Sequence, residues 1–431
     1  MTAQSYSRTD FERCLEVGRP PNVHQLFPHS KALLVSGKFI DLAMLKKGKA
    51  ICLAANARNS FVLKGALLGA QRANACLIIE IARSEGGAKA YCDVTLWNIA
   101  HKVDQACNEL GITVPVAVHA DHYGIKKLDD IEPAKIEIPS LFDAGITSIA
   151  VDASHLPDDQ NLLTSIELND VVPDWSGLET EVGEIKGKAG LSTPEEARFL
   201  IQGLNAHDIF PNWIALNNGS THGLESTAGD DIDVELTRTI HQTLEPYKVS
   251  GAQHGTSGNS SAHLREIAEQ TRTTKANVAT ALQMIAWGVK VNDYGNAIQD
   301  DEGNFIKVEG SGVTEEVWRQ MTEYAQKQGL QGNDYKKLNR PFEPVFLGQP
   351  REVRQRMIDA VADFAYDMIV NVFNAKDTAP LAVEEILSAG SHDPGPKAGR
   401  IEDPADWSPE RIKEKAGSLS SDKGPAGDFD D

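Results

Sequence analysis

The chain has 431 residues, and 62 acidic against 42 basic side chains give it a formal net charge of −20. This excess of negative charge argues against binding to nucleic acid. The N-terminus lacks the apolar core of a signal peptide, and no segment approaches the roughly 18 apolar residues of a membrane span. We therefore expect a cytoplasmic protein without a membrane partner. Its five cysteines, which include no CxxC pair, are expected to be reduced thiols.

In chain order, residues 1–45 are predicted to form a leader that packs on the outside or the base of the main domain. From there, apolar β-rich segments alternate with amphipathic segments, which is typical of βα repetition and a parallel sheet. The predicted strands are Ala50–Ala55, Ala75–Ala82, Val114–His119, Ser148–Asp152, Leu178–Val182, Trp213–Leu216, Val249–Ala252 and Val289–Asn292. Helical patterns between them include Phe61–Arg72, Val94–Leu110, Pro194–Leu204, Val234–Leu244 and Ala276–Trp287.

Eight βα units in about 250 residues are the count expected of an α/β fold of the (β/α)8 TIM-barrel type. An open, doubly wound sheet is the alternative. The barrel domain is predicted to span residues 46–380, including C-terminal helices at Val313–Gln328 and Arg351–Phe373. Residues 381–431 are rich in Pro, Gly, Ser and charge and predict a flexible tail, with Trp407 as a candidate docking residue.

Histidines follow three different predicted strands. The tetrapeptide HADH (119–122) ends the third strand, and His222 and His254, each followed by glycine, come after the sixth and seventh. One histidine at a strand end is more often structural, and a glycine-rich loop is often only a turn. Together, however, three imidazoles and a nearby carboxylate favour a Zn²⁺ site with one position open for substrate.

Carboxylates accompany these histidines. Asp152 ends the fourth strand, and Glu179 and Glu181 alternate on the fifth, so that both point to the same face. If that face is the barrel interior, one of the two glutamates can reach the histidine cluster. A buried carboxylate needs a partner, which a metal ion would supply. A lysine or arginine partner is the other explanation.

Six segments in register resemble the class II, metal-dependent ketose-bisphosphate aldolases. They are HADH (119–122), DASH (152–155), LETEVGEIKG (178–187), NNGSTHG (217–223), AQHGTSG (252–258) and VKVN (289–292). The resemblance implies that His122, His222 and His254 bind Zn²⁺ or another divalent metal, with Asp152 and Glu181 at an alternative metal position or behind the ligands. It further implies that Asp121 handles the proton of the aldehyde hydroxyl during carbon–carbon cleavage.

The same resemblance implies a sugar-phosphate substrate and an assembly of two or more copies. Positions that match the substrate and phosphate contacts of the family are Asn56, Gly219, Ser220, Gly223, Gly255, Ser257, Gly258 and Asn292. Cleavage of a β-hydroxy ketone leaves an enediolate, whose two oxygens a divalent ion can chelate without a Schiff base. The sequence therefore predicts a zinc-dependent aldolase that acts on a phosphorylated ketose.

Two segments depart from the family pattern. The family has a long acidic loop after the fifth strand, whereas Glu184 is the only acid before the next helix and stands earlier than the family's acid. After Asn292, the expected acid or alanine followed by threonine is absent from the Asp293-Tyr294 segment. We therefore rank an altered ketose substrate slightly above fructose 1,6-bisphosphate. A non-catalytic barrel that serves as a structural or sugar-phosphate-binding subunit and a metal-dependent hydrolase remain as alternatives.

Overall fold

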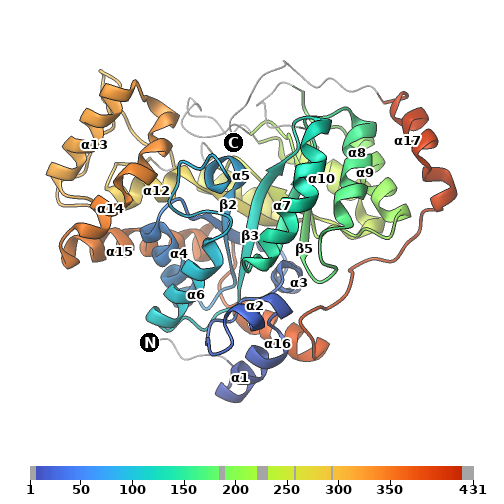
Figure 1. Ribbon diagram of the computed structural model, residues 1–431, viewed down its shortest axis with the longest axis horizontal. Helices are drawn as coiled ribbons and strands as arrows, with labels where there is room; N and C mark the ends of the chain where they lie inside the picture. The colour runs from blue at the N-terminus through green and yellow to red at the C-terminus, as the bar shows by residue number, and fades with distance from the viewer. Residues whose placement is uncertain (1–5, 184–189, 221–231, 257–258, 293–294, 420–431) are drawn as a thin grey trace.

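A closed barrel of parallel strands forms the centre of the computed structural model, which describes residues 6–183, 190–220, 232–256, 259–292 and 295–419 (Figure 1). The strands are hydrogen-bonded in chain order, and β8 pairs with β1 to close the sheet. Their bounds are β1 Cys52–Asn56, β2 Leu77–Ala82, β3 Val116–Gly124, β4 Ser148–Asp152, β5 Gly177–Val182, β6 Trp213–Leu216, β7 Ser250–Gln253 and β8 Thr273–Val278. The predicted TIM barrel is confirmed.

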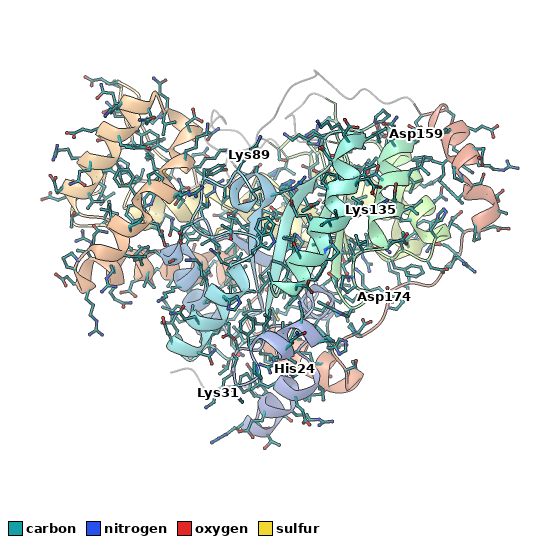
Figure 2. All side chains as sticks on the ribbon, in the orientation of Figure 1. His24, Lys31, Lys89, Lys135, Asp159 and Asp174 are labelled. Carbon is teal, nitrogen blue, oxygen red and sulfur yellow. The ribbon has the colours of Figure 1, made fainter. Side chains whose placement is uncertain are left out.

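Helices follow the strands and cover the outside of the barrel. They are α4 Ser60–Ala73, α5 Arg83–Gly86, α6 Ile99–Leu110, α7 Ile131–Asp143, α8 Asp158–Asn169, α9 Pro194–Ala206, α10 Val234–Thr243, α11 Ser261–Gln270 and α12 Thr280–Trp287. Their outer faces carry charged side chains such as Lys135 on α7, which forms ion pairs with Glu132 and Glu167 (Figure 2). None of the described helices is both long and apolar enough to cross a bilayer.

The eighth strand corrects the sequence prediction. Val289–Asn292 is not a barrel strand, because it follows α12 and makes only isolated antiparallel bridges to Lys307 and Ala297. The closing strand is Thr273–Val278, whose second half falls in the segment predicted as helix. Its alternating Thr, Lys and Asn residues lack the apolar pattern by which the other strands were found.

The base of the barrel is closed by the N-terminal segment. Helices α1 Arg8–Val17, α2 Pro21–Leu26 and α3 Gly37–Lys47 lie at the lower end of the barrel in Figure 1. Gly37 begins α3 against the inside of the base, where a Cβ atom would lie 2.7 Å from Ser148 Oγ and 2.9 Å from Trp213. Only glycine permits this close approach of α3 to Ser148 and Trp213. The N-terminal segment thus packs on the base of the barrel.

The C-terminal part extends the barrel on two sides. Helices α13 Glu315–Gln328, α14 Asn339–Gly348 and α15 Arg351–Asp367 form a lobe beside α4 and α12, and α16 Ala379–Ala389 returns to the base (Figure 1). The segment predicted as a flexible tail, residues 381–431, includes most of α16, and its described part then runs along the barrel to α17 Pro409–Ala416. Trp407 is 2% exposed and packs on Phe199, at a centroid distance of 5.6 Å. The domain bounds at residues 45 and 380 stay predictions.

Candidate functional site

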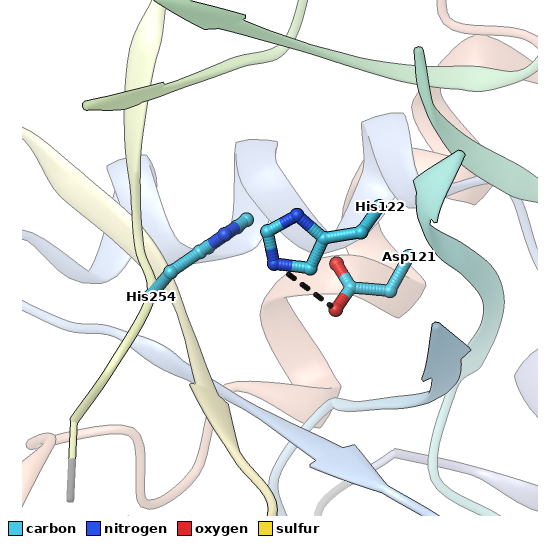
Figure 3. A group of neighbouring side chains, drawn as sticks. All are labelled: Asp121, His122 and His254. Atoms are coloured by element: carbon cyan, nitrogen blue, oxygen red, sulfur yellow. Dashed lines mark ion pairs between the residues drawn. The ribbon is translucent and has the colours of Figure 1, made fainter. Parts of the chain in front are cut away.

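A bulge in β3 brings two consecutive residues to the barrel mouth. Strand alternation alone would send Asp121 and His122 to opposite faces. The pairing of β3 with β4 shifts register between Ala120 and Tyr123, and His122 has a φ of +41°. This left-handed conformation is uncommon for a residue other than glycine and is often found at functional sites. Because of the bulge, the two side chains lie together and are both buried (Figure 3).

His122 lies within reach of ligand atoms from three other strands. Its Nδ1 is 3.0 Å from Glu181 Oε1 on β5 and 3.9 Å from Asp152 Oδ2 on β4, and its Nε2 is 3.9 Å from Asp121 Oδ2. The ring of His254, which directly follows β7, faces it at a centroid distance of 4.2 Å (Figure 3). The barrel thus brings together five residues from four segments that are far apart in the sequence.

His254 has the geometry of a metal ligand supported from behind. Its Nε2 is 2.7 Å from Glu179 Oε1, while its Nδ1 is buried without a hydrogen-bond partner among the described residues. A carboxylate on one ring nitrogen fixes the tautomer and leaves the other nitrogen to a metal. Donor atoms of Asp121, His122 and His254 lie within 4.8 Å of one another, as do those of His122, Asp152 and Glu181. This donor set of imidazoles and carboxylates fits a divalent metal ion such as Zn²⁺.

Below this group, a buried lysine balances the carboxylates of the barrel interior. Lys275 Nζ on β8 lies 2.9 Å from Glu179 Oε2, 3.2 Å from Glu80 Oε2 and 3.3 Å from Asp121 Oδ1. Burial lowers the pKa of Lys275, but these three carboxylates outweigh it and raise the pKa well above its ordinary value. Glu179 therefore has the cationic partner that the sequence left open, and His119 joins the same group at 3.4 Å from Glu179.

The pKa values of two carboxylates among these donor residues, Asp152 and Glu181, are shifted in opposite directions. Burial raises the pKa of Asp152, but hydrogen bonding and charge from His122 and the charge of His155 outweigh it and lower the pKa to about 2. Burial and the neighbouring Asp152 raise the pKa of Glu181 to about 7. One carboxylate is thus ionised near neutrality, while the other is only partly protonated there. Such a pair can both bind a cation and exchange a proton.

Asp121 is held in its ionised form. Burial raises its pKa, but Lys275 and the three neighbouring histidines outweigh this and lower the pKa below its usual range. Asn277 Nδ2 also donates a hydrogen bond of 2.9 Å to Asp121 Oδ2. Asn277 on β8 thus occupies the position at the site that was expected for Asn292. The half-buried Asn292 instead lies beyond α12, where its backbone and side chain bond Asn296.

The other predicted residues divide between the mouth and the undescribed segments. Asn56 ends β1 and donates to Glu85, and Gly219, Ser220 and Gly255 follow β6 and β7. Gly219 and Gly255 have φ angles of +99° and +60°, which turn these loops at the mouth. Five predicted residues lie outside the described residues: Glu184, His222, Gly223, Ser257 and Gly258.

Sequence reasoning missed the side chains that support the site. Lys275 and Asn277 both point inward from β8, and their two-residue spacing was the signal available for finding them. Glu80 on β2 and Glu85 on α5 are 0% and 1% exposed, but neither belongs to a recognisable motif. Their partners come from distant segments, so only the fold reveals them.

Comparisons with known proteins identify a family for this chain. The family model described as fructose-bisphosphate aldolase class-II matches residues 41–329. A fructose-bisphosphate aldolase of Mycoplasma pneumoniae is 28% identical over 247 residues, which cover 57% of this chain and 79% of that relative. One of Staphylococcus aureus is 29% identical over 177 residues, 39% of this chain and just over half, 56%, of its own length.

Solved structures share the fold. The YdjI aldolase from Escherichia coli K12 superimposes with a TM-score of 0.53 at 17% identity, covering 80% of this chain and 99% of that one. Fructose-bisphosphate aldolase from Campylobacter jejuni gives the same TM-score and identity over 80% and 97% of the two chains. The family model covers well over half of the chain and includes every barrel strand. The chain therefore belongs to the class II fructose-bisphosphate aldolase family.

Proposed function

We propose that this protein is a zinc-dependent aldolase that cleaves or forms the carbon–carbon bond of a phosphorylated ketose. One observation carries the proposal: the ionised Asp121 lies among His122, His254 and Asn277 at the mouth of the barrel. His122 and His254 would hold the metal ion, and Asp152 and Glu181 would offer a second set of donors. His222 is proposed as a further ligand from the family resemblance.

When bound, a divalent ion would stabilise the negative charge that develops on the oxygens of the ketose fragment. Asp121 would accept the proton of the hydroxyl group that becomes the aldehyde, and Asn277 would hold Asp121 in place. Lys275 would keep Asp121 ionised. Glu181, with a pKa of about 7, is a candidate for proton exchange alongside the predicted Glu184.

The phosphate would lie in the loops after β6, β7 and β8. Gly219, Ser220, Gly255, Ser257 and Gly258 are the proposed contacts, in the region where TIM barrels often bind phosphate. With β8 at Thr273–Val278, Asn277 is followed by Ala279 and Thr280, the order that the family places after its last strand. The absence of a threonine after Asn292 therefore no longer supports an altered phosphate site.

The test combines metal analysis with a screen of ketose monophosphates and bisphosphates, with and without EDTA. We expect close to one metal ion per chain and turnover that EDTA abolishes. Asp121→Ala should lower kcat by about 100-fold to 10,000-fold without loss of metal. Asp143→Ala, on the exposed face of α7, is the matched control.

Full turnover by the metal-free protein would contradict the mechanism. Binding of a sugar phosphate without measurable turnover of any ketose tested, in the unmodified protein as in Asp121→Ala, would favour the alternative of a non-catalytic, sugar-phosphate-binding barrel. Efficient cleavage of fructose 1,6-bisphosphate to triose phosphates would show that the substrate is the usual one of the family rather than an altered ketose. A copy number above one in solution would support the predicted homo-oligomer, which rests on the resemblance alone.

A further inference from the structure

A buried arginine stands at the barrel mouth beside the proposed site. Arg58 comes two residues after the end of β1 and is 5% exposed. Its Nε donates a hydrogen bond of 2.6 Å to Glu85 Oε1, and its Nη1 lies 3.3 Å from both Thr280 Oγ1 and Gln283 Oε1. Among the described residues, no hydrogen bond uses Nη2. The guanidinium is thus anchored on one side and keeps one nitrogen for a ligand.

Glu85 holds Arg58 and Asn56 together. Its carboxylate accepts hydrogen bonds of 2.6 Å from Arg58 Nε and from Asn56 Nδ2, and a longer one of 3.3 Å from Tyr91. Asn56 Oδ1 is left buried without a partner among the described residues. Glu85 thus fixes the side-chain amide of Asn56 and the plane of the guanidinium.

The neighbour of Arg58 is the start of a helix that has no side-chain cap. Thr280 begins α12, and the residue before it, Ala279, has no side chain able to bond the first amides. Such a helix end presents free N–H groups and a partial positive charge, both of which favour an anion. The Thr280 hydroxyl oxygen accepts from Arg58, so its own proton remains available for donation.

The position of this group connects it to the reaction. Thr280 comes three residues after Asn277, the side chain that bonds Asp121. β1 and β8 are hydrogen-bonded neighbours, so Asn56 and Arg58 lie beside the end of β8. The Arg58–Glu85 pair carries no net charge, and Lys336, 5.6 Å from the Tyr91 ring centre, adds a cation nearby. Hydrogen-bond donor groups therefore lie beside the reacting centre.

We propose that Arg58, held by Glu85, is an additional residue that selects the phosphate group of the ketose fragment, beside Thr280 and the first amides of α12, which belong to the phosphate site of the proposed function. This inference rests on the proposed aldolase function and adds a residue of this chain that decides which substrates it takes. A phosphate oxygen would receive hydrogen bonds from Nη2 and from the Thr280 hydroxyl. The site would therefore discriminate against ketose fragments that lack the phosphate.

Three variants separate this role from a merely structural one. Arg58→Met removes the donor, Arg58→Lys keeps the charge but loses the planar fork, and Arg58→Met combined with Glu85→Gln avoids leaving a buried unpaired carboxylate. The double variant keeps the question answerable if Arg58→Met alone does not fold. Arg72→Met is the control, because Arg72 forms an exposed ion pair with Asp363 on the outer surface.

The first measurement is calorimetric binding of inorganic phosphate to the metal-loaded protein. We expect at least tenfold weaker binding in both Arg58→Met proteins, an intermediate loss in Arg58→Lys and no change in Arg72→Met. Unchanged phosphate affinity in a folded Arg58→Met protein would overturn the inference. This measurement requires no turnover, so it remains valid even if the proposed aldolase activity fails.

The second measurement compares dihydroxyacetone phosphate with dihydroxyacetone as the nucleophile in aldol addition to one aldehyde. We expect Arg58→Met to lower kcat/KM for the phosphorylated compound by about 100-fold, and for the other by less than threefold. Equal losses for both would overturn the inference and leave the aldolase activity standing. Absence of turnover in the unmodified protein would instead count against the proposed function alone.

Discussion

At the scale of one residue, His241 shows how burial outside the candidate site shifts the pKa of a side chain. It lies near the end of α10 and is 4% exposed, and its Nδ1 accepts a hydrogen bond of 3.1 Å from the Arg272 amide. A Cβ at Gly251 would stand only 2.5 Å from its Nε2, so the ring is packed directly on β7. Burial, followed by the charge of Arg272, lowers the pKa of His241 to about 4.

This shift predicts a pH dependence of folding stability. Between about pH 6.5 and pH 4 the unfolded chain binds a proton at His241 that the folded chain does not, so stability decreases as the pH falls. We expect a loss of about 2–3 kcal/mol in the free energy of unfolding between pH 7 and pH 4.5 from this residue. His241→Asn should flatten that part of the urea-denaturation profile, whereas His29→Asn, at an exposed site, should not. Identical slopes in all three proteins would refute the assignment.

At the scale of the element, the sequence predicts the fold well where a strand buries apolar side chains. The segments Ala75–Ala82 and Ser148–Asp152 carry such runs, and both form strands within a few residues of the prediction. β8 was missed because its interior residues, Lys275 and Asn277, bond carboxylates from other strands. The sequence could not show those partners, because Asp121 lies 156 residues before Asn277. The bulge that turns His122 inward is equally invisible to a rule of strict alternation.

The segment after α16 yields an element-scale prediction. Lys397 Nζ reaches the barrel base, where it contacts Asp41 and donates to Asn212 O at 3.0 Å and Ser250 Oγ at 2.9 Å. Asp41 is 0% exposed and also accepts from Thr274. Lys397→Met would leave Asp41 as a buried carboxylate without its cation, which should cost about 3–5 kcal/mol.

The measurement is the free energy of unfolding of Lys397→Met, with Lys46→Met as the matched control. Lys46 pairs with Glu384 and Glu385 at the partly exposed surface, where such pairs contribute about 0–1 kcal/mol. Combining Lys397→Met with Asp41→Asn should recover part of the loss, because the uncompensated charge is gone. A Lys397→Met protein as stable as the control variant would show that this segment does not hold the base of the barrel.

At the scale of the whole molecule, the barrel separates its two ends by function. The mouth gathers ionisable groups whose pKa values are moved in opposite directions, as in Asp152 and Glu181. The base is closed by α3 and by Lys397, whose Nζ donates hydrogen bonds to Asn212 O and Ser250 Oγ. This division is typical of TIM barrels, in which loops at one end carry the chemistry and the other end supports stability. Opening of the whole barrel should therefore be rare under native conditions.

The thiols offer a direct test of that rarity. The cysteines Cys14, Cys52, Cys76, Cys92 and Cys107 are free and buried, and burial raises the pKa of Cys14 and Cys76 to about 12. Thiol exchange requires a solvent-accessible thiolate, so both access and ionisation oppose reaction in the folded state. At pH 7.5 we expect Ellman's reagent to label less than one thiol per chain before the barrel unfolds, and all five in guanidinium chloride. A thiol that reacted at once while circular dichroism remained native would place at least one cysteine outside the rigid core.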